Sequence, residues 1–267
     1  MLHYRTHYLA ENKPWVTLIH GAGGNSAVWF KQLRDYKKQF NVLLIDLRGH
    51  GKSQKVHWKK EDNFITLSNE VMAVLDHLNI RTSHFVGISL GTIVIQTIAQ
   101  QYPKRVESMV LGGAITGINL RTKCYLTLGH IGKYVLPYMW IYRLFAWIIM
   151  PRKNHKEARI TFVEQAKGMC QKQFIKWFSL TQNVSPFLKE LQQDFKDIPT
   201  LFIMGEQDYL FLDLVEDVVL KTNYYVRLEC IENAGHVCNI DQSQIFNEKS
   251  IHFMLNNKNR IIPVKSS

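Results

Sequence analysis

Short apolar runs alternate along the chain with longer segments in which apolar residues recur every three or four positions. The short runs predict strands at residues 6–9, 15–20, 41–46, 83–88, 106–112, 200–204 and 225–231. The periodic segments predict helices at residues 26–39, 66–78, 90–101, 212–221 and 242–255. Continuous apolar strands separated by helices are typical of a mostly parallel, doubly wound α/β sheet with both faces covered.

This alternation stops in the middle of the chain. Residues 115–195 keep a helical periodicity but carry no strand signal. A chain of 267 residues is long enough for one large domain with a deep core. We therefore predict one α/β core formed by residues 1–114 and 196–267, into which residues 115–195 are inserted as helices.

The first part of the insertion, residues 124–150, is unusually apolar and long enough to be considered as a transmembrane segment. It is interrupted by Lys133 and Arg143, and each centrally placed charge costs ~2.5–3.5 kcal/mol on insertion into a bilayer. Pro137 adds a further break. Two short helices that meet near Pro137 are the preferred interpretation.

One pentapeptide combines a nucleophile with a tight turn. Gly87-Ile88-Ser89-Leu90-Gly91 lies between a predicted strand and a predicted helix. A serine on such a turn has a strained backbone and an exposed hydroxyl, and the flanking glycines allow the strand and the helix to approach closely. Taken alone, the motif could be an ordinary glycine-rich turn, but its place between strand and helix favours a nucleophilic serine.

A nucleophilic serine needs a base and a group that orients the base. Asp208 follows the predicted strand at residues 200–204, and His236 follows the one at residues 225–231. Glu206 lies on the same loop as Asp208 and is the alternative acid. The order serine, acid, histidine is that of the α/β-hydrolases, and it differs from the orders in chymotrypsin-like and subtilisin-like enzymes.

Five segments in the expected order carry a resemblance to the α/β-hydrolase superfamily, in its serine esterase or lipase-like form with a helical cap. They are His20-Gly21-Ala22-Gly23-Gly24, Asp46-Leu47-Arg48-Gly49-His50-Gly51-Lys52-Ser53, the pentapeptide around Ser89, Gly205-Glu206-Gln207-Asp208 and Gly235-His236. The resemblance covers essentially the whole length and implies that residues 115–195 form a cap over the catalytic pocket.

The resemblance also implies roles for individual residues. Ser89 is the expected nucleophile, His236 the base and Asp208 the residue that orients it. The backbone N–H groups of Ala22 and Leu90 are the expected oxyanion hole. Within the glycine loop, the donating residue is assigned only to within one position of Ala22.

Other residues near these segments are expected to support loops. His20 is expected to order the glycine loop by hydrogen bonding, and Gly21 and Gly23 to let backbone approach a substrate oxygen. Asp46 and Arg48 could be a catalytic acid and cation, but an ion pair that braces their turn is the preferred interpretation.

The charge is concentrated in the insertion. The chain has a formal net charge of +11, and residues 115–195 contain twelve basic and four acidic residues, a net charge of +8. A solvated helical surface is the simplest interpretation. The alternative hypothesis is that this basic, aromatic-rich segment contacts anionic membranes or accepts acidic substrates. No nucleic-acid-binding motif accompanies the charge, so we do not expect nucleic-acid binding.

Composition adds an expectation about the compartment. Cys124, Cys170, Cys230 and Cys238 have no metal-site or disulfide spacing, and are expected to be reduced and mostly buried. The first twenty residues lack the pattern of a signal peptide, so a cytoplasmic location is expected.

The expected activity is hydrolysis of carboxylic esters through an acyl-enzyme, with neither a metal nor an organic cofactor. Many aromatic and aliphatic residues of the insertion favour a small hydrophobic substrate, with an apolar acyl or alcohol group. A carbon–carbon bond hydrolase or a thioesterase with the same triad, and a weakly catalytic receptor of the same fold, are the alternatives. A serine at position 89 disfavours epoxide hydrolases and haloalkane dehalogenases, since the members of those classes that the chain resembles carry aspartate there. The oligomeric state is left open.

Overall fold

A seven-stranded sheet forms the centre of the computed structural model, which describes residues 1–181, 184–193, 195, 197–222 and 225–256. The strands are β1 (Tyr4–His7), β2 (Trp15–Ile19), β3 (Asn41–Ile45), β4 (Ser83–Ile88), β5 (Val106–Gly112), β6 (Thr200–Gly205) and β7 (Val226–Ile231). Their order is β1-β3-β2-β4-β5-β6-β7; β1 pairs antiparallel with β3, and all the other pairs are parallel. The predicted mostly parallel sheet is confirmed.

The inner strands are buried on both faces, which explains why they read as continuous apolar runs. Every residue of β3, β4 and β6 is buried. The predicted strand ends lie within one residue of the observed ones for six strands. β1 begins two residues earlier than predicted, because its exposed edge position leaves only a weak apolar pattern.

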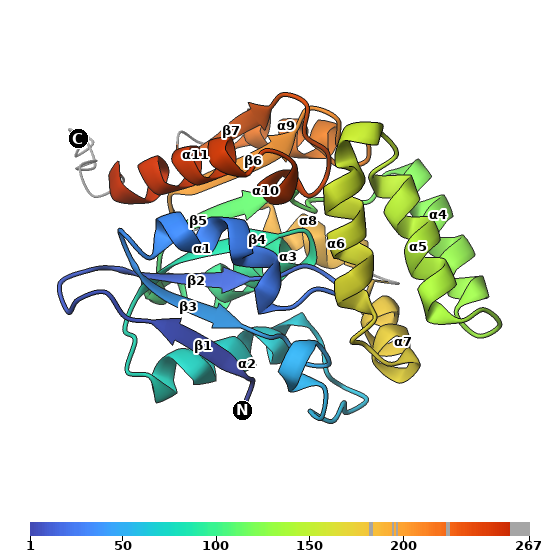
Figure 1. The fold of residues 1–267 in the computed structure, drawn as a ribbon, viewed down its shortest axis with the longest axis horizontal. Coiled ribbons are helices and arrows are strands. Elements are labelled where there is room, and N and C mark those ends of the chain that lie inside the picture. Colours follow the sequence, from blue (N-terminus) through green and yellow to red (C-terminus); the bar gives the residue numbers. More distant parts are fainter. Residues whose placement is uncertain (182–183, 194, 196, 223–224, 257–267) are drawn as a thin grey trace.

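Helices cover both faces of the sheet. α1 (Phe30–Tyr36) and α11 (Ser243–Asn256) pack together on one face, and α2 (Phe64–His77) and α3 (Leu90–Gln101) pack together on the other (Figure 1). Short 3-10 turns η1 (Ser26–Trp29), η2 (Gly51–Ser53) and η3 (Pro103–Arg105) precede or connect these helices. α9 (Leu212–Lys221) and the short α10 (Cys238–Asp241) complete the layers around β6 and β7.

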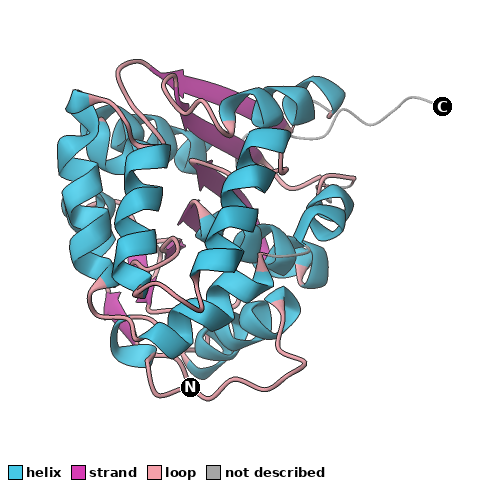
Figure 2. Cartoon of the chain, turned by 90° about the vertical axis from the view of Figure 1, so that its right-hand side faces the viewer, coloured by secondary structure: helices cyan, strands magenta, loops and turns pink. Residues whose placement is uncertain are grey.

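The insertion between β5 and β6 contains α4 (Leu120–Gly132), α5 (Tyr138–Ile149), η4 (Lys153–His155), α6 (Lys156–Ala166), α7 (Gln171–Leu180) and α8 (Val184–Leu191). The described residues between β5 and β6 include no strand, as predicted. α4 to α7 lie beyond the carboxyl ends of the strands (Figure 1), and Figure 2, seen from that end, shows helices in front of the sheet. The exact domain boundaries stay a prediction.

The apolar run at residues 124–150 forms two helices. α4 ends at Gly132, and Pro137 is the N-cap of α5. Lys133 lies in the connection and is buried, where its Nζ bonds His130 and Ser179. In the part of the chain that the structure describes, no helix has the length and apolar content needed to cross a bilayer.

The approach of α3 to the sheet depends on a glycine. A Cβ atom built on Gly91 would lie 2.4 Å from the carbonyl oxygen of Ile19 and 2.7 Å from that of His20. Both neighbours are backbone atoms of β2 and the loop after it, so they cannot rotate away. The helix that follows Ser89 can therefore pack this close only with glycine at position 91.

We predict that Gly91→Ala lowers the free energy of unfolding by about 1–3 kcal/mol, because the added methyl forces α3 away from β2. Chemical denaturation followed by circular dichroism measures this change. Gly117→Ala is the control, since a Cβ there meets only Leu214 side-chain atoms at 3.7 Å. It should change stability by less than about 1 kcal/mol. Equal losses in both variants would contradict the packing argument.

Candidate active site

Ser89 occupies the sharp turn between β4 and α3 with a strained backbone. Its φ and ψ are 53° and −122°, so a non-glycine residue adopts a positive φ here. The turn is held on both sides: the Ser89 N–H donates to the Gly112 carbonyl at 2.9 Å, and the Ser89 carbonyl accepts from the Thr92 N–H at 2.8 Å. The strain predicted from the pentapeptide is present.

A continuous hydrogen-bonded chain joins Ser89, His236 and Asp208. His236 Nε2 lies 2.8 Å from Ser89 Oγ, and its Nδ1 lies 2.8 Å from Asp208 Oδ2. Because an ionised carboxylate only accepts, Nδ1 carries the proton and Nε2 accepts from the serine hydroxyl. Asp208 and His236 are both 1% exposed, whereas Ser89 is half-buried. The Ser89 hydroxyl is thus the solvent-accessible end of a hydrogen-bonded series whose other two members are buried.

The same geometry separates Asp208 from its sequence neighbour Glu206. The Glu206 side chain is exposed, and among the described residues its Oε2 accepts only a long 3.5 Å bond from the Asn233 N–H. Asp208 points instead to His236 from the loop after β6. Of the two acids that the sequence offered, only Asp208 contacts the histidine.

Hydrogen bonds to the carbonyls of Gly21 and Ala22 and to the N–H of Gly23 fix the glycine loop after β2. The Gly21 carbonyl accepts from His20 Nδ1 at 2.8 Å and from the Gly24 N–H at 3.1 Å. The Ala22 carbonyl accepts from the Tyr142 hydroxyl, and the Gly23 N–H donates to His50 Nε2 at 2.9 Å. Within the described residues, the N–H of Ala22 donates no hydrogen bond. The loop therefore holds this donor rigidly and leaves it available.

Two buried histidines, both with neutral rings, hold the glycine loop in place. His20 Nε2 accepts from the Leu47 N–H at 3.0 Å, and His50 Nδ1 donates to the Arg48 carbonyl at 3.0 Å. Burial lowers the pKa of His20 and lowers that of His50 further, with the nearby His20 as a second cause. Both rings are thus neutral near pH 7 with the proton on Nδ1. His20 was expected in this role from the sequence, whereas His50 was not.

Tyr142 is the second residue that sequence reasoning missed as a site residue. It lies on α5 in the insertion, its ring stacks on Phe162 with centroids 4.5 Å apart, and it is buried. Burial raises the pKa of its hydroxyl well above the ordinary value, so the hydroxyl keeps its proton and donates to Ala22. Gly23 has a φ of 70°, and a Cβ there would overlap the Tyr142 ring. Helix α5 thus contacts the glycine loop directly.

The predicted ion pair between Asp46 and Arg48 is wrong. Asp46 accepts the N–H groups of Ser26 at 2.8 Å and Lys52 at 2.9 Å. Arg48 instead pairs with Asp62 and with Glu70 on α2. Both residues brace loops, as expected, but through partners other than each other.

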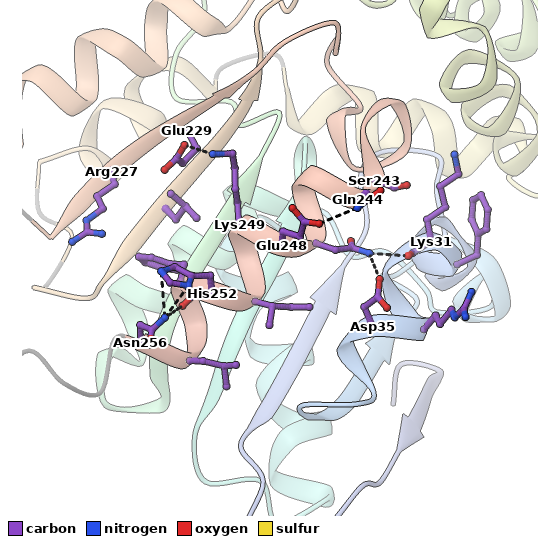
Figure 3. A pocket seen from close by; sticks show the side chains of 17 residues that line it. Lys31, Asp35, Arg227, Glu229, Ser243, Gln244, Glu248, Lys249, His252 and Asn256 are labelled. Atoms are coloured by element: carbon purple, nitrogen blue, oxygen red, sulfur yellow. Dashed lines mark hydrogen bonds and ion pairs between the residues drawn. The ribbon is translucent and has the colours of Figure 1, made fainter.

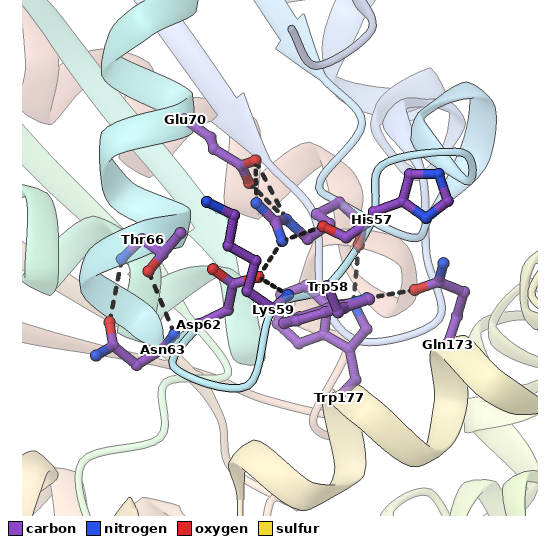
Figure 4. A network of polar contacts seen from close by, with 10 residues as sticks. His57, Trp58, Lys59, Asp62, Asn63, Thr66, Glu70, Gln173 and Trp177 are labelled. Atoms are coloured by element: carbon purple, nitrogen blue, oxygen red, sulfur yellow. Dashed lines mark hydrogen bonds and ion pairs between the residues drawn. The ribbon is translucent and has the colours of Figure 1, made fainter.

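The network around Arg48 also reaches the insertion. Figure 4 shows Asp62 and Glu70 converging with the loop at His57, whose carbonyl accepts from Arg48 Nη1 at 2.7 Å. Trp177 of α7 donates its indole N–H to the Arg48 carbonyl at 2.8 Å. This loop therefore connects α2 with the inserted helices next to the candidate site.

The cysteines differ from expectation in their exposure. All four are free, as predicted, but Cys124, Cys170 and Cys230 are exposed, and only Cys238 is buried. The expectation that most of them are buried rested on their number and spacing alone, and it is wrong for three of the four. Cys238 Sγ donates to the Ile203 carbonyl at 3.3 Å, and burial raises the pKa of its thiol, so it is an unreactive packing residue.

One groove of the molecule lies away from these residues. A groove of about 1300 Å³ lies between α1, β7 and α11 (Figure 3), and no residue of the chain Ser89–His236–Asp208 lines it. Its charged side chains are partly paired, for example Lys249 with Glu229 at 2.7 Å. In the described part of the chain, no three His, Cys, Asp or Glu side chains are placed to hold a metal ion.

Comparisons with known proteins agree with this architecture. The model of the alpha/beta hydrolase fold matches residues 14–133. An uncharacterized carboxylesterase of Bacillus subtilis is 24% identical over 93% of this chain and 83% of its own length, and human epoxide hydrolase 4 is 24% identical over 91% and 74%. The crystal structure of a hydrolase from Pseudomonas aeruginosa superposes with a TM-score of 0.81 at 23% identity, covering 95% of this chain and 94% of that one.

Proposed function

We propose that this chain is a serine hydrolase of the α/β-hydrolase superfamily, and that it cleaves carboxylic esters with an apolar acyl or alcohol group. One observation carries the proposal: the unbroken hydrogen-bonded chain from Ser89 through His236 to Asp208, with 2.8 Å at both links. This is the arrangement that activates a serine hydroxyl for attack on a carbonyl.

In the proposed reaction, His236 Nε2 takes the Ser89 proton as Oγ bonds to the carbonyl carbon. Asp208 holds the imidazole in the required tautomer and stabilises the imidazolium that forms. The imidazolium then gives its proton to the leaving alcohol, which produces an acyl-serine. Water attacks the acyl-serine with His236 as base, which releases the acid and restores Ser89.

The negative charge of the tetrahedral intermediate requires donors that are already in place. The Ala22 N–H is held by the fixed glycine loop, and the Leu90 N–H lies at the N-terminus of α3, where the helix dipole favours an anion. Each such donor typically stabilises the transition state by ~2.7–4 kcal/mol. The hydrogen bonds of His20, His50 and Tyr142 make the loop rigid without using the Ala22 N–H.

Fewer residues support an apolar substrate in the structure than the sequence suggested. Trp140, Leu144 and Trp147 are exposed, so they do not line an enclosed pocket. Apolar groups next to the proposed triad remain: the Phe211 ring lies 5.1 Å from the His236 ring, and Tyr142 covers the glycine loop. We propose that α5 and its neighbouring helices cover the site.

Other activities of the superfamily remain as alternatives that the same experiments test. A thioesterase or a carbon–carbon bond hydrolase would use the same three residues, and a receptor would be acylated but turn over slowly. The similarity to an epoxide hydrolase does not favour that activity, because position 89 is serine and not aspartate. The carboxylesterase among the similar proteins favours ester hydrolysis.

The first test is labelling with a fluorophosphonate, followed by turnover of p-nitrophenyl esters of increasing chain length. Ser89→Ala should abolish labelling, and Ser89→Ala and His236→Ala should each lower kcat by several orders of magnitude while the circular dichroism stays native. The double variant should be hardly slower than either single one, because triad residues act as a unit. Additive losses would contradict the triad, and fast labelling with slow turnover would favour a receptor.

The second test concerns the acid. Asp208→Asn should lower kcat by roughly 10⁴-fold, since an amide at this position favours the wrong imidazole tautomer. Glu206→Gln is the matched control on the same loop and should leave kcat near the wild-type value, because Glu206 is exposed and does not contact His236. Greater damage from Glu206→Gln would show that the proposal assigns the acid to the wrong residue.

The third test concerns the contact between α5 and the glycine loop. Tyr142→Phe removes the hydrogen bond to Ala22 and should lower kcat by roughly tenfold with little change in KM, since one hydrogen bond contributes ~0.5–1.5 kcal/mol. Tyr138→Phe is the control: it removes a hydroxyl from the same helix that bonds only the carbonyls of Ala166 and Met169. Equal effects on kcat in both variants would indicate a loss of helix packing and not of loop positioning.

A further inference from the structure

Helix α5 has two different faces. Ile141, Tyr142 and Ile149 are buried against the rest of the molecule, whereas Trp140, Leu144 and Trp147 are 66%, 63% and 58% exposed. These exposed residues are spaced by four and three positions, so they form one stripe along the helix. Two large indole rings and a leucine therefore face solvent on the side of α5 that points away from the glycine loop.

Helix α4 and its connection to α5 carry further exposed apolar residues. Leu128 and Ile131 of α4 and Tyr134 of the connection are 62%, 66% and 75% exposed. α4 and α5 run side by side at the end of the molecule that lies beyond the carboxyl ends of the strands (Figure 1). We call the six exposed residues Leu128, Ile131, Tyr134, Trp140, Leu144 and Trp147 the hairpin surface. An exposed apolar surface of this kind usually marks an interaction site.

The charge around the hairpin surface has a single sign. No aspartate or glutamate occurs in the sequence between Glu107 and Glu157. Arg121, Lys123 and Arg143 are exposed, and within the described residues none of them forms an ion pair. The segment that carries the apolar stripe thus also carries exposed positive charge, and no acid of the same segment neutralises it.

We propose that the hairpin surface binds the surface of an anionic lipid bilayer. Indole and phenol rings favour the boundary between headgroups and acyl chains, and exposed arginine and lysine are attracted to anionic headgroups. A second copy of this chain is a poor occupant, since it would bring the same positive charge and no acid to the contact. The binding is peripheral, because the described helices are too short to cross the bilayer.

The position of the surface gives the binding a consequence. The same helix that presents Trp140 and Trp147 to the bilayer reaches the glycine loop through Tyr142 on its other face. Docking through the hairpin surface would therefore hold the carboxyl ends of the strands, where Ser89 lies, toward the membrane. Binding itself needs no catalysis, so it stands independently of the proposed activity.

The test is co-sedimentation of the full chain with vesicles of phosphatidylcholine alone and of phosphatidylcholine mixed with phosphatidylserine. We expect binding to the mixed vesicles at low salt, little binding to neutral vesicles, and a steep loss at high salt, because screening shortens the reach of each charge to ~8 Å at physiological ionic strength. Ser89→Ala should bind as the wild type does, which separates this result from any failure of the proposed activity.

Two sets of variants assign the binding to the hairpin surface. Replacing Arg121, Lys123 and Arg143 with glutamine should weaken binding on the order of 100-fold, since each basic residue near the surface contributes about fivefold. The matched control replaces three exposed lysines outside the insertion, Lys37, Lys60 and Lys104, and should change binding far less.

The second set of variants tests the apolar residues and combines Trp140→Ala with Leu144→Ala. This double variant should bind roughly tenfold more weakly, and brominated lipid should quench its tryptophan emission less than that of the wild type. Leu220→Ala, on α9 and 83% exposed, is its control. Absence of binding to the mixed vesicles at low salt would overturn the proposal, as would equal effects of hairpin and control variants. A dimer in solution that the hairpin variants convert to a monomer would assign the surface to a second copy instead.

Discussion

The close approach of α3 to β2 and β4 is the constraint on which the candidate site depends. It forces the chain to reverse from strand to helix within one residue, and Ser89 takes a positive φ at that point. Gly91 permits the approach because any side chain there would meet the backbone of Ile19. The strain is held by hydrogen bonds to Gly112 and Thr92 on either side. Since the turn is rigid, the serine hydroxyl has a fixed direction that a histidine from a distant loop can meet.

The rest of the site is assembled from loops that follow parallel strands of the same sheet. His236 and Asp208 follow β7 and β6, and the glycine loop follows β2, so all three loops lie at one edge of the sheet. A parallel sheet brings such loops together whatever their separation in the sequence. The buried His20 and His50, kept neutral by burial, then fix the glycine loop by hydrogen bonds in which each ring both donates and accepts.

The inserted helices connect this site to the surface of the molecule. Tyr142 links α5 to the glycine loop, and Trp177 links α7 to the loop at Arg48. On the opposite side of α5, exposed aromatic residues and unpaired positive charge face solvent. One amphipathic helix thus has two functions in our proposals: its buried face positions the oxyanion donor, and its exposed face contacts lipid.

The sequence by itself determined the features that depend on local chemistry and on periodicity. Apolar runs located all seven strands, the proline at position 137 separated the two helices of the apolar segment, and the glycines around Ser89 indicated a strained turn. Motif order also selected Ser89 and His236, because a serine, an acid and a histidine that each follow a strand in this order are typical of a catalytic triad. The strands, the proline break and the strained turn are readable because each residue there acts on its immediate neighbours, and the order of the three motifs is readable because each motif directly follows a strand.

Only the tertiary structure decided which distant side chains meet. It gave Arg48 the partners Asp62 and Glu70 in place of Asp46, and it brought Tyr142 to Ala22 across 120 positions of sequence. It also showed that the aromatic residues of α5 divide between core and solvent. Such pairings depend on how separate elements pack, and an ion pair or a hydrogen bond between them leaves no periodic trace in the sequence that could predict it.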